Sequence, residues 1–224
     1  MWAIVVAGGS GRRFGSRKQF LPLAGIPVVA WSVRAARTVA DGVVLVVPDD
    51  VDTENDGPID PGASDEARFG ATRVVTGGAT RSASVRAGLA AVPVDAGIII
   101  VHDAARPLAE AGLFAAVVEA VRTTEIDGAI PVLPVSDTLK RVEDGRIIET
   151  VPREGLVVIQ TPQAFVAEAL RTAHGDGGEA TDDAGLLEAA GLVVGAVEGD
   201  PRNLKLTQPE DLALAEALLS GGRS

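Results

Sequence analysis

A glycine-rich loop followed by cations lies near the start of the chain, where residues 6–20 read VAGGSGRRFGSRKQF directly after an apolar run. Glycines allow backbone N–H groups to approach phosphate oxygens, and the side chains of Arg13 and Lys18 would neutralise phosphate charge. The spacing fits neither a dinucleotide fingerprint, which needs glycine at Phe14, nor a Walker A loop, which needs glycine at Arg17. We therefore predict a phosphate-binding loop of another kind, with a turn flanked by solvated bases as the alternative.

A second candidate motif, IIIVHDAARP, spans residues 98–107 and places polar side chains after another apolar run. The carboxyl ends of parallel strands meet at one edge of a sheet, so Asp103 and Arg106 would face the same crevice as the glycine-rich loop. A carboxylate there could bind ribose hydroxyls or a phosphate-bound Mg²⁺, and the guanidinium could bind phosphate. The alternative is a helix N-cap at Asp103 with a solvated Arg106. We interpret His102 as a structural hydrogen-bonding residue rather than a catalyst.

The charges of the chain are unevenly distributed. It carries 20 Lys and Arg against 31 Asp and Glu, a net charge of −11. This balance argues against nonspecific binding to nucleic acid or to anionic membranes. The first forty residues nevertheless hold six of the bases and no acid. That local excess favours a small anionic ligand near the amino terminus.

Cysteine is absent, and the two histidines are His102 and His174. These counts exclude disulfides, thiolate nucleophiles and cysteine-ligated zinc, and they disfavour a histidine-based metal site. No apolar run reaches the roughly eighteen residues that a membrane-spanning helix needs, and the first residues lack the basic region of a signal peptide. We therefore predict a cytoplasmic protein.

Apolar runs of strand length alternate with segments of helical periodicity along the chain. Continuous apolar runs are typical of strands buried on both faces, and their alternation with helices predicts a mostly parallel sheet flanked by helices. At this length we interpret the chain as one domain, residues 1–224. The expected strands cover residues 2–6, 43–47, 98–101, 129–133, 157–160 and 192–196, and the expected helices cover residues 28–37, 82–91, 113–122, 163–172, 183–190 and 210–219.

Two segments interrupt this alternation. Residues 49–66 carry eight acids and no base, and they predict a solvated loop. Residues 136–150 alternate polar and apolar side chains around Glu143, Asp144 and Gly145, a pattern typical of a β-hairpin. Such an arm needs a surface to cover its apolar face, and a second subunit could supply one.

Together these motifs make the chain similar to the 2-C-methyl-D-erythritol 4-phosphate cytidylyltransferases of non-mevalonate isoprenoid synthesis. The resemblance covers nearly the whole chain, and several ordered motifs are more specific than any single one. It implies a Rossmann-like three-layer α/β sandwich of the nucleotide-diphospho-sugar transferase type, with a protruding β-hairpin arm. Besides the two motifs above, it rests on GGATRSASV (77–85), SDTLKRV (136–142), PREGLVVIQTPQAF (152–165), ATDDA (180–184) and NLKLTQPEDLALAE (203–216).

The resemblance also implies roles for individual residues. Arg13 and Lys18 would stabilise the pentavalent phosphorus of the transition state, and Arg153 and Lys205 would position the methylerythritol phosphate for attack. The arm, residues 136–153, would join a homodimer, so that each active site is shared between two chains. The positions expected to bind the nucleotide or the polyol are Ala7, Gly8, Gly78, Ser84, Asp103, Ala104, Arg106, Thr138, Thr161 and Thr181.

The implied substrates are CTP and 2-C-methyl-D-erythritol 4-phosphate, and the implied cofactor is Mg²⁺, held mainly by the triphosphate near Asp103. The sequence departs from the family pattern at two places. The loop between Arg13 and Lys18 looks shortened, and Ala79 stands where the family often has an acidic or polar residue. Two alternatives therefore stay open: a cytidylyltransferase for ribitol 5-phosphate or another sugar phosphate, and a nucleotide-binding module without catalysis.

Overall fold

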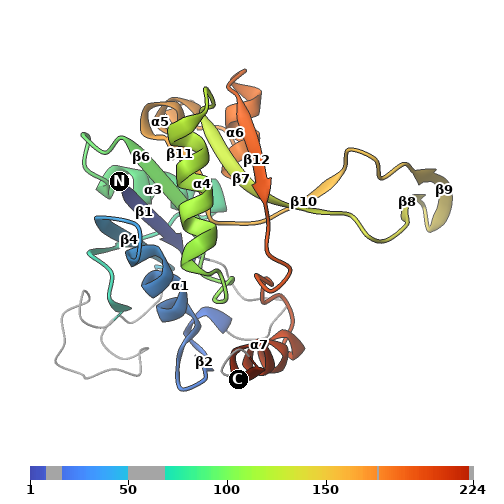
Figure 1. The fold of residues 1–224 in the computed structure, drawn as a ribbon, viewed down its shortest axis with the longest axis horizontal. Coiled ribbons are helices and arrows are strands. Elements are labelled where there is room, and N and C mark those ends of the chain that lie inside the picture. Colours follow the sequence, from blue (N-terminus) through green and yellow to red (C-terminus); the bar gives the residue numbers. More distant parts are fainter. Residues whose placement is uncertain (9–16, 50–68, 176, 222–224) are drawn as a thin grey trace.

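The computed structural model describes residues 1–8, 17–49, 69–175 and 177–221. In this part of the chain an eight-stranded sheet lies between layers of helices, and a hairpin extends away from the body (Figure 1). The strand order is β10-β7-β11-β6-β1-β4-β5, and β12 also pairs with β7. The strands are β1 (Trp2–Val6), β4 (Gly42–Val47), β5 (Arg73–Thr76), β6 (Ile98–Asp103), β7 (Gly128–Pro134), β10 (Val157–Ile159), β11 (Gln163–Val166) and β12 (Val194–Glu198).

The sheet is mostly parallel, as predicted. β1 pairs in parallel with β4 and β6, β4 with β5, and β7 with β12, whereas β10 and β11 run antiparallel to their neighbours. Val6, the last residue of β1, is in register with Asp103, the last residue of β6. The chain that follows β1 therefore leaves the sheet directly beside Asp103.

Helices cover both faces of the sheet, which confirms the three-layer fold. On α1, Val29, Val33 and Ala36 share one face and pack with Phe114 of α4 in one core, while α3, α5 and α6 contribute to a second core across the sheet. Fully burying one large apolar side chain contributes about 1.5–3 kcal/mol, so these faces fix the helices on the sheet. The helices are α1 (Val28–Arg37), α3 (Arg81–Ala91), α4 (Ala111–Thr123), α5 (Ala167–Gly175), α6 (Asp183–Ala189) and α7 (Glu210–Gly221).

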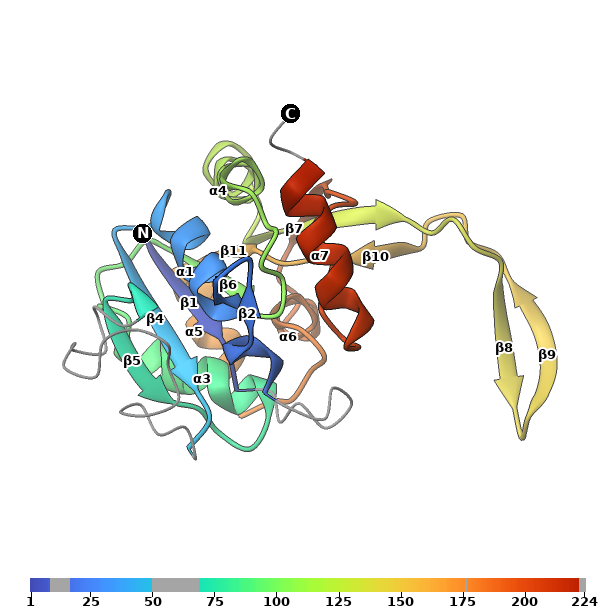
Figure 2. The ribbon, with the colours of Figure 1, turned by 90° about the horizontal axis from the view of Figure 1, so that it is seen from below.

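The C-terminal helix α7 belongs to a third, smaller core. Ala215 of α7 packs with Leu23, Val28 and Leu206, beside the short ribbon of β2 (Pro22–Leu23) and β3 (Ile26–Pro27). Figure 2 shows α7 lying across one end of the body, on the side from which the hairpin leaves. This third core ties the end of the chain to the segment that follows the glycine-rich loop.

The structure differs from the sequence prediction at three places in the sheet. The helix predicted over residues 163–172 begins only at Ala167, because residues 163–166 form strand β11 between β6 and β7. Phe165 is fully buried there, so pairing within the sheet overrides the local helical pattern. Strand β5 was not predicted. The predicted burial of residues 157–160 on both faces was also wrong, since the side chains of Val157 and Val158 are about half exposed.

The predicted hairpin is present and consists of β8 (Leu139–Glu143) and β9 (Arg146–Val151). Asp144 and Gly145 have φ angles of 47° and 76°, so the hairpin closes through a two-residue turn that requires left-handed backbone at both positions. Val142 lies opposite Ile147 across the two strands, and their side chains are 55% and 62% exposed. The arm therefore presents apolar side chains that no other described part of this chain covers.

No helix among the described residues combines the length and apolar character needed to cross a membrane. The cytoplasmic location stays a prediction. The loop predicted over residues 49–66 lies, apart from Asp49, outside the described residues.

Candidate active site

The carboxyl end of β6 carries a buried cluster of charges centred on Asp103. Lys205 Nζ lies 2.6 Å from Asp103 Oδ2, and Arg81 Nε lies 3.2 Å from Asp103 Oδ1. Arg81, at the start of α3, also reaches Asp183 at the start of α6, with 2.8 Å between Nη1 and Oδ2. His174 Nε2 lies 3.0 Å from the other oxygen of Asp183. Two acids and two cations, drawn from four distant stretches of the chain, thus meet at one edge of the sheet.

The charges of this cluster stabilise one another. Burial alone would raise the pKa of Asp103, but the nearby Arg81 and Lys205 outweigh it and hold that pKa well below its ordinary value. Burial acts to lower the pKa of Arg81, but the carboxylates of Asp183 and Asp103 hold it above its ordinary value. Asp103 is therefore an anion and Arg81 a cation near neutral pH.

His102 has the structural role that the sequence suggested. Its side chain is fully buried, and burial lowers its pKa to about 4. The Thr161 hydroxyl accepts a hydrogen bond from the Asp103 backbone N–H at 3.0 Å and lies 3.0 Å from His102 Nδ1. The His102 Nε2 atom lies 3.2 Å from the Arg106 carbonyl oxygen. A neutral imidazole that accepts from Thr161 and donates to Arg106 satisfies all of these contacts.

Arg106 faces the chain rather than open solvent. Its Nη1 donates to the Asn203 carbonyl at 2.8 Å and its Nη2 to the Ile159 carbonyl at 3.2 Å. Asn203 in turn donates from Nδ2 to the Thr161 carbonyl at 2.9 Å. Burial lowers the pKa of Arg106 from its ordinary value. Asp103, Arg106, Thr161 and Lys205, four of the predicted site residues, are therefore held in one hydrogen-bonded unit.

Lys18 joins this unit from the other side. Its Nζ donates to the carbonyl of Leu206, the residue that follows Lys205. The Lys18 ammonium group thus contacts the backbone segment that carries Lys205, the other lysine predicted to act on phosphate. Arg13 lies outside the described residues.

The positions predicted to contact the nucleotide lie along the carboxyl ends of β1 and β5. The Gly78 N–H donates to Ser84 Oγ at 3.2 Å, and a Cβ built on Gly8 would lie 3.0 Å from the same oxygen. A Cβ on Gly78 would lie 2.5 Å from Ala83 Cβ, so a side chain at this position would have to displace helix α3. Ala7 and Ala104, which were also predicted to contact the nucleotide, are buried. With no side chain at Gly8 and Gly78, the backbone can lie close to Ser84 and to helix α3.

Three of the predicted residues take no part in the hydrogen bonds and ion pairs of the Asp103 cluster in the described part of the chain. Thr138 and Arg153 lie at the base of the arm and are exposed, and Arg153 donates to the nearby Ser136 carbonyl. Thr181 is exposed beside Asp182, whose side chain caps α6 by accepting from the Gly185 N–H at 3.1 Å. The arm projects away from the body (Figures 1 and 2), so its residues need another surface to complete a site.

A family model described as 2-C-methyl-D-erythritol 4-phosphate cytidylyltransferase (IspD) matches residues 1–221. The chain belongs to this family. It is 45% identical to the 2-C-methyl-D-erythritol 4-phosphate cytidylyltransferase of Cereibacter sphaeroides, and the match covers 97% of this chain and 96% of the relative. It is 41% identical to a bifunctional enzyme IspD/IspF of Nitratidesulfovibrio vulgaris, over 96% of this chain but 57% of that relative. This chain thus spans little more than half the length of the bifunctional relatives.

Solved structures of the IspD family share the fold. The 2-C-methyl-D-erythritol 4-phosphate cytidylyltransferase of Thermus thermophilus superposes with a TM-score of 0.79 at 37% identity, covering 97% of this chain and 98% of that one. A 4-diphosphocytidyl-2C-methyl-D-erythritol synthase of Anaerococcus prevotii gives a TM-score of 0.80 at 28% identity, covering 98% of this chain and 97% of that one. The predicted fold class is confirmed.

Sequence reasoning missed Arg81, His174 and Asp183 in this IspD-family chain. Arg81 and Asp183 stand inside two of the motifs that carried the resemblance, GGATRSASV and ATDDA. The available signal for Arg81 was its charge within a run of small side chains. Their pairing could not be read from the sequence, because the two residues lie on different helices and meet only through the fold.

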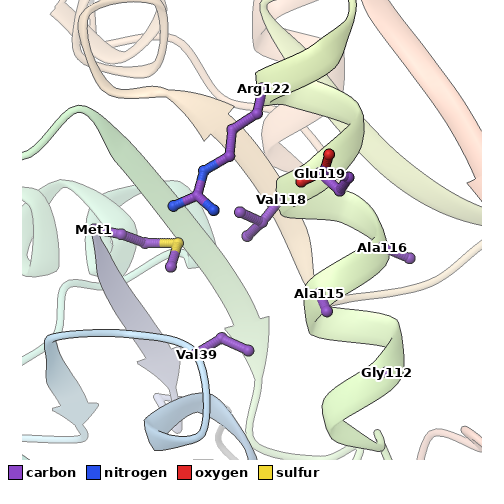
Figure 3. Close-up of a pocket in the computed structure, with 8 residues that line it drawn as sticks. All are labelled: Met1, Val39, Gly112, Ala115, Ala116, Val118, Glu119 and Arg122. Carbon is purple, nitrogen blue, oxygen red and sulfur yellow. The ribbon is translucent and has the colours of Figure 1, made fainter.

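A surface hollow at the opposite edge of the sheet has no part in this site. It lies between the amino terminus and α4, and Met1, Val39, Val118, Glu119 and Arg122 are among its lining residues (Figure 3). Met1 precedes β1, so the hollow faces the amino end of that strand, whereas Asp103 lies at the carboxyl end of the sheet. Parallel α/β sheets bind their ligands at the carboxyl edge.

Proposed function

We propose that this chain transfers the cytidylyl group of CTP to 2-C-methyl-D-erythritol 4-phosphate. A phosphate oxygen of the polyol would attack the α-phosphorus of CTP and form a new P–O bond, while the bond from the α-phosphorus to the bridging oxygen breaks and pyrophosphate leaves. The products are 4-diphosphocytidyl-2-C-methyl-D-erythritol and pyrophosphate. The observation that carries the proposal is the convergence of Lys18 and Lys205 on one backbone segment beside Asp103, in a chain of the IspD family.

The reaction needs no protein base. A phosphate monoester is largely dianionic near neutral pH, since its second pKa is about 6, so its oxygen can attack directly. The protein must bring two anionic reactants together and offset the charge that accumulates between them. Lys205 would hold the polyol phosphate, and Lys18, with Arg13 from outside the described residues, would act on the triphosphate. Gly8, Gly78 and Ser84 would hold the base.

Magnesium would be held mainly by the triphosphate. The described residues contain no group of three or more Asp, Glu or His side chains that could bind a metal. Asp103 is the carboxylate nearest the proposed phosphate site, and it already pairs with Arg81 and Lys205. The residues present therefore fit a metal that arrives with its nucleotide and lies near Asp103. When bound, Mg²⁺ would neutralise triphosphate charge.

The arm is proposed to complete the active site of a second copy of this chain. Thr138 and Arg153 lie at its base, beside the ends of β8 and β9, and both residues are exposed. The exposed apolar pair Val142 and Ile147 needs a covering surface. A twofold dimer would bury both arms and would carry Arg153 of each to the other body.

A substrate panel tests the reaction. Purified protein, CTP and Mg²⁺ are mixed in turn with 2-C-methyl-D-erythritol 4-phosphate, ribitol 5-phosphate and other sugar phosphates, and pyrophosphate release is followed. We expect release that depends on CTP and on the methylerythritol phosphate together. Turnover with ribitol 5-phosphate alone would assign a different acceptor, and CTP binding without turnover on any acceptor would indicate a non-catalytic module.

Mixing two inactive variants tests the shared site. Lys205→Ala removes the lysine from the body, and Arg153→Ala removes the arginine from the arm. If each site uses one body and the other chain's arm, a mixed dimer contains one intact site, so an equal mixture that exchanges subunits should regain about a quarter of wild-type turnover. Recovery should rise with time of exchange. A mixture that stays as inactive as its components would show that each chain completes its own site.

A further inference from the structure

If the proposed function holds, Lys205 interacts with two different anions, Asp103 and the phosphate of the polyol substrate. In the structure its ammonium group lies 2.6 Å from Asp103 Oδ2, yet the proposed reaction assigns it to the phosphate of the polyol substrate. The Lys205 side chain is 44% exposed and that of Asp103 is 13% exposed. The lysine can therefore turn toward a ligand, whereas the carboxylate stays where it is. Turning away would deprive a largely buried anion of one of its two cations, which is costly unless another donor replaces it.

Arg81 has the geometry to replace it. At present its Nε donates to Asp103 Oδ1. Its Nη1 and Nη2 are buried and make no hydrogen bond in the described part of the chain, but Nη1 lies at ion-pair distance from Asp183, whereas Nη2 has neither kind of partner there. Nε and Nη2 lie on the same edge of a guanidinium group, and that edge can pair with both oxygens of a carboxylate. If Lys205 leaves, a small rotation of the Asp103 carboxylate would give Oδ2 to the vacant Nη2.

Arg81 is also held in place independently of Lys205. Its Nη1 lies 2.8 Å from Oδ2 of Asp183, a side chain that is 1% exposed. His174 Nε2 lies 3.0 Å from the other oxygen of Asp183 and is itself buried. Departure of Lys205 thus leaves Arg81 anchored at its far end, with its Nε and Nη2 edge facing Asp103.

We propose that Arg81 is a positioning residue for the transfer reaction: it takes over both oxygens of Asp103 when Lys205 moves to the substrate phosphate. The inference rests on the proposed function, because that function supplies the phosphate to which Lys205 moves. Without Arg81, Lys205 would be the only cation that compensates the charge of Asp103. Moving Lys205 to the substrate phosphate would then cost more free energy.

Two substitutions at Arg81 separate positioning from stability. Arg81→Gln removes the charge, and Arg81→Lys keeps the charge but has no two-pronged edge. We expect the KM for the polyol phosphate to rise about tenfold in both variants, the cost of one charge-assisted hydrogen bond, with a smaller change in the KM for CTP. The midpoint of thermal unfolding should fall in Arg81→Gln and recover in Arg81→Lys. A purely structural arginine would give a KM that recovers together with the unfolding midpoint, and that result would overturn the proposal.

Arg171→Gln is the matched control. Arg171 also bridges distant segments, donating to the carbonyls of Leu89, Val92 and Pro93 at 3.1–3.2 Å, but it lies away from the site. Its loss should lower the unfolding midpoint and leave both KM values unchanged.

A double substitution tests whether Arg81 acts through Asp103. Once Asp103→Asn has removed the anion, adding Arg81→Gln should raise the KM for the polyol phosphate no further. Full additivity of the two effects would overturn the proposal. Calorimetric titration of each protein with the polyol phosphate in the presence of CTP distinguishes the two levels of inference. Binding and turnover in wild type with unchanged KM in Arg81→Gln would refute only the role of Arg81, whereas neither binding nor turnover in wild type would refute the proposed function as well.

Discussion

The charged cluster in the body and the charged arm use the same kinds of side chain in opposite ways. In the body, the paired side chains of Arg81 and Asp103 are 23% and 13% exposed, whereas on the arm those of Arg141 and Glu149 are 56% and 52% exposed. Ion pairs gain strength where water is excluded and contribute little where it is not. The body can therefore hold its cations in place before a substrate arrives. The arm can place Arg153 only through whatever surface it packs against.

Removing Lys205 should give the largest effect, because it takes away the cation that the proposed reaction assigns to the polyol phosphate. In Lys205→Ala we expect turnover to fall about 10²–10³-fold, the typical loss for one preorganised donor. Pyrophosphate release under saturating substrates measures it. Arg122→Gln, at the opposite edge of the sheet, is the control and should keep wild-type turnover. If turnover in Lys205→Ala fell less than threefold, the Asp103 cluster would have no part in the reaction.

The buried His102 should make the stability of the body depend on pH. Its pKa is about 4 in the folded protein and near 6.5 when exposed, so the unfolded chain binds a proton over a range in which the folded chain does not. Its contribution is full above about pH 6.5 and is lost as the pH falls to about 4, by about 3 kcal/mol. Urea unfolding at several pH values measures this. The slope over that range should be smaller in His102→Asn, and equal slopes would show that His102 is not held neutral.

Asp211 offers an effect of intermediate size at the start of α7. Burial alone would raise its pKa, but hydrogen bonds from the Thr207 and Gln208 N–H groups, at 2.6 and 2.8 Å, hold that pKa below its ordinary value. Asp211→Ala should cost about 1 kcal/mol of unfolding free energy, as expected for a lost helix cap. The spacing of Thr207 and Glu210 in the sequence is that of a capping box, but in the structure Asp211 accepts from the Thr207 N–H instead. Glu210→Ala should therefore cost clearly less, and the reverse order would favour the capping box.

The arm should give the smallest effect. The Arg141 and Glu149 pair, at 2.6 Å, lies on exposed strands, so Arg141→Gln should change the unfolding free energy by less than about 0.5 kcal/mol. Chemical denaturation measures the change. If Arg141→Gln lost as much unfolding free energy as Asp211→Ala, the arm would be buried against another surface in solution. The difference between the ion pairs of the arm and those of the body would then be smaller.

Much of the fold could be predicted from the sequence because local pattern and final environment agree. The residues of α1 carry an apolar stripe and pack on the sheet with it, and Asp144 and Gly145 suit the turn that they form. Prediction failed at residues 163–166, where a helical pattern was overridden by two neighbouring strands.

The candidate site was predicted only in part, because some of its residues stand in recognisable sequence motifs and others do not. Asp103, Arg106 and Lys205 follow recognisable segments, and the fold brings them together. Arg81 and Asp183 were missed because a pair between two helices leaves no periodic signal in either. The roles of all these residues stay predictions until the variants are measured.

The antiparallel pairing of β7 and β10 has a consequence for how this protein can change in evolution. β7 ends at Pro134 and β10 begins opposite it at Val157, so the intervening chain leaves the sheet and returns to it at one point of the edge where Asp103 lies. A segment inserted between two such adjacent ends can lengthen, shorten or alter its tip without moving any strand of the core. The proposed subunit pairing could therefore change in evolution without altering the sheet that carries the candidate site, although any change in the arm would still act at the edge of the sheet where Asp103 lies.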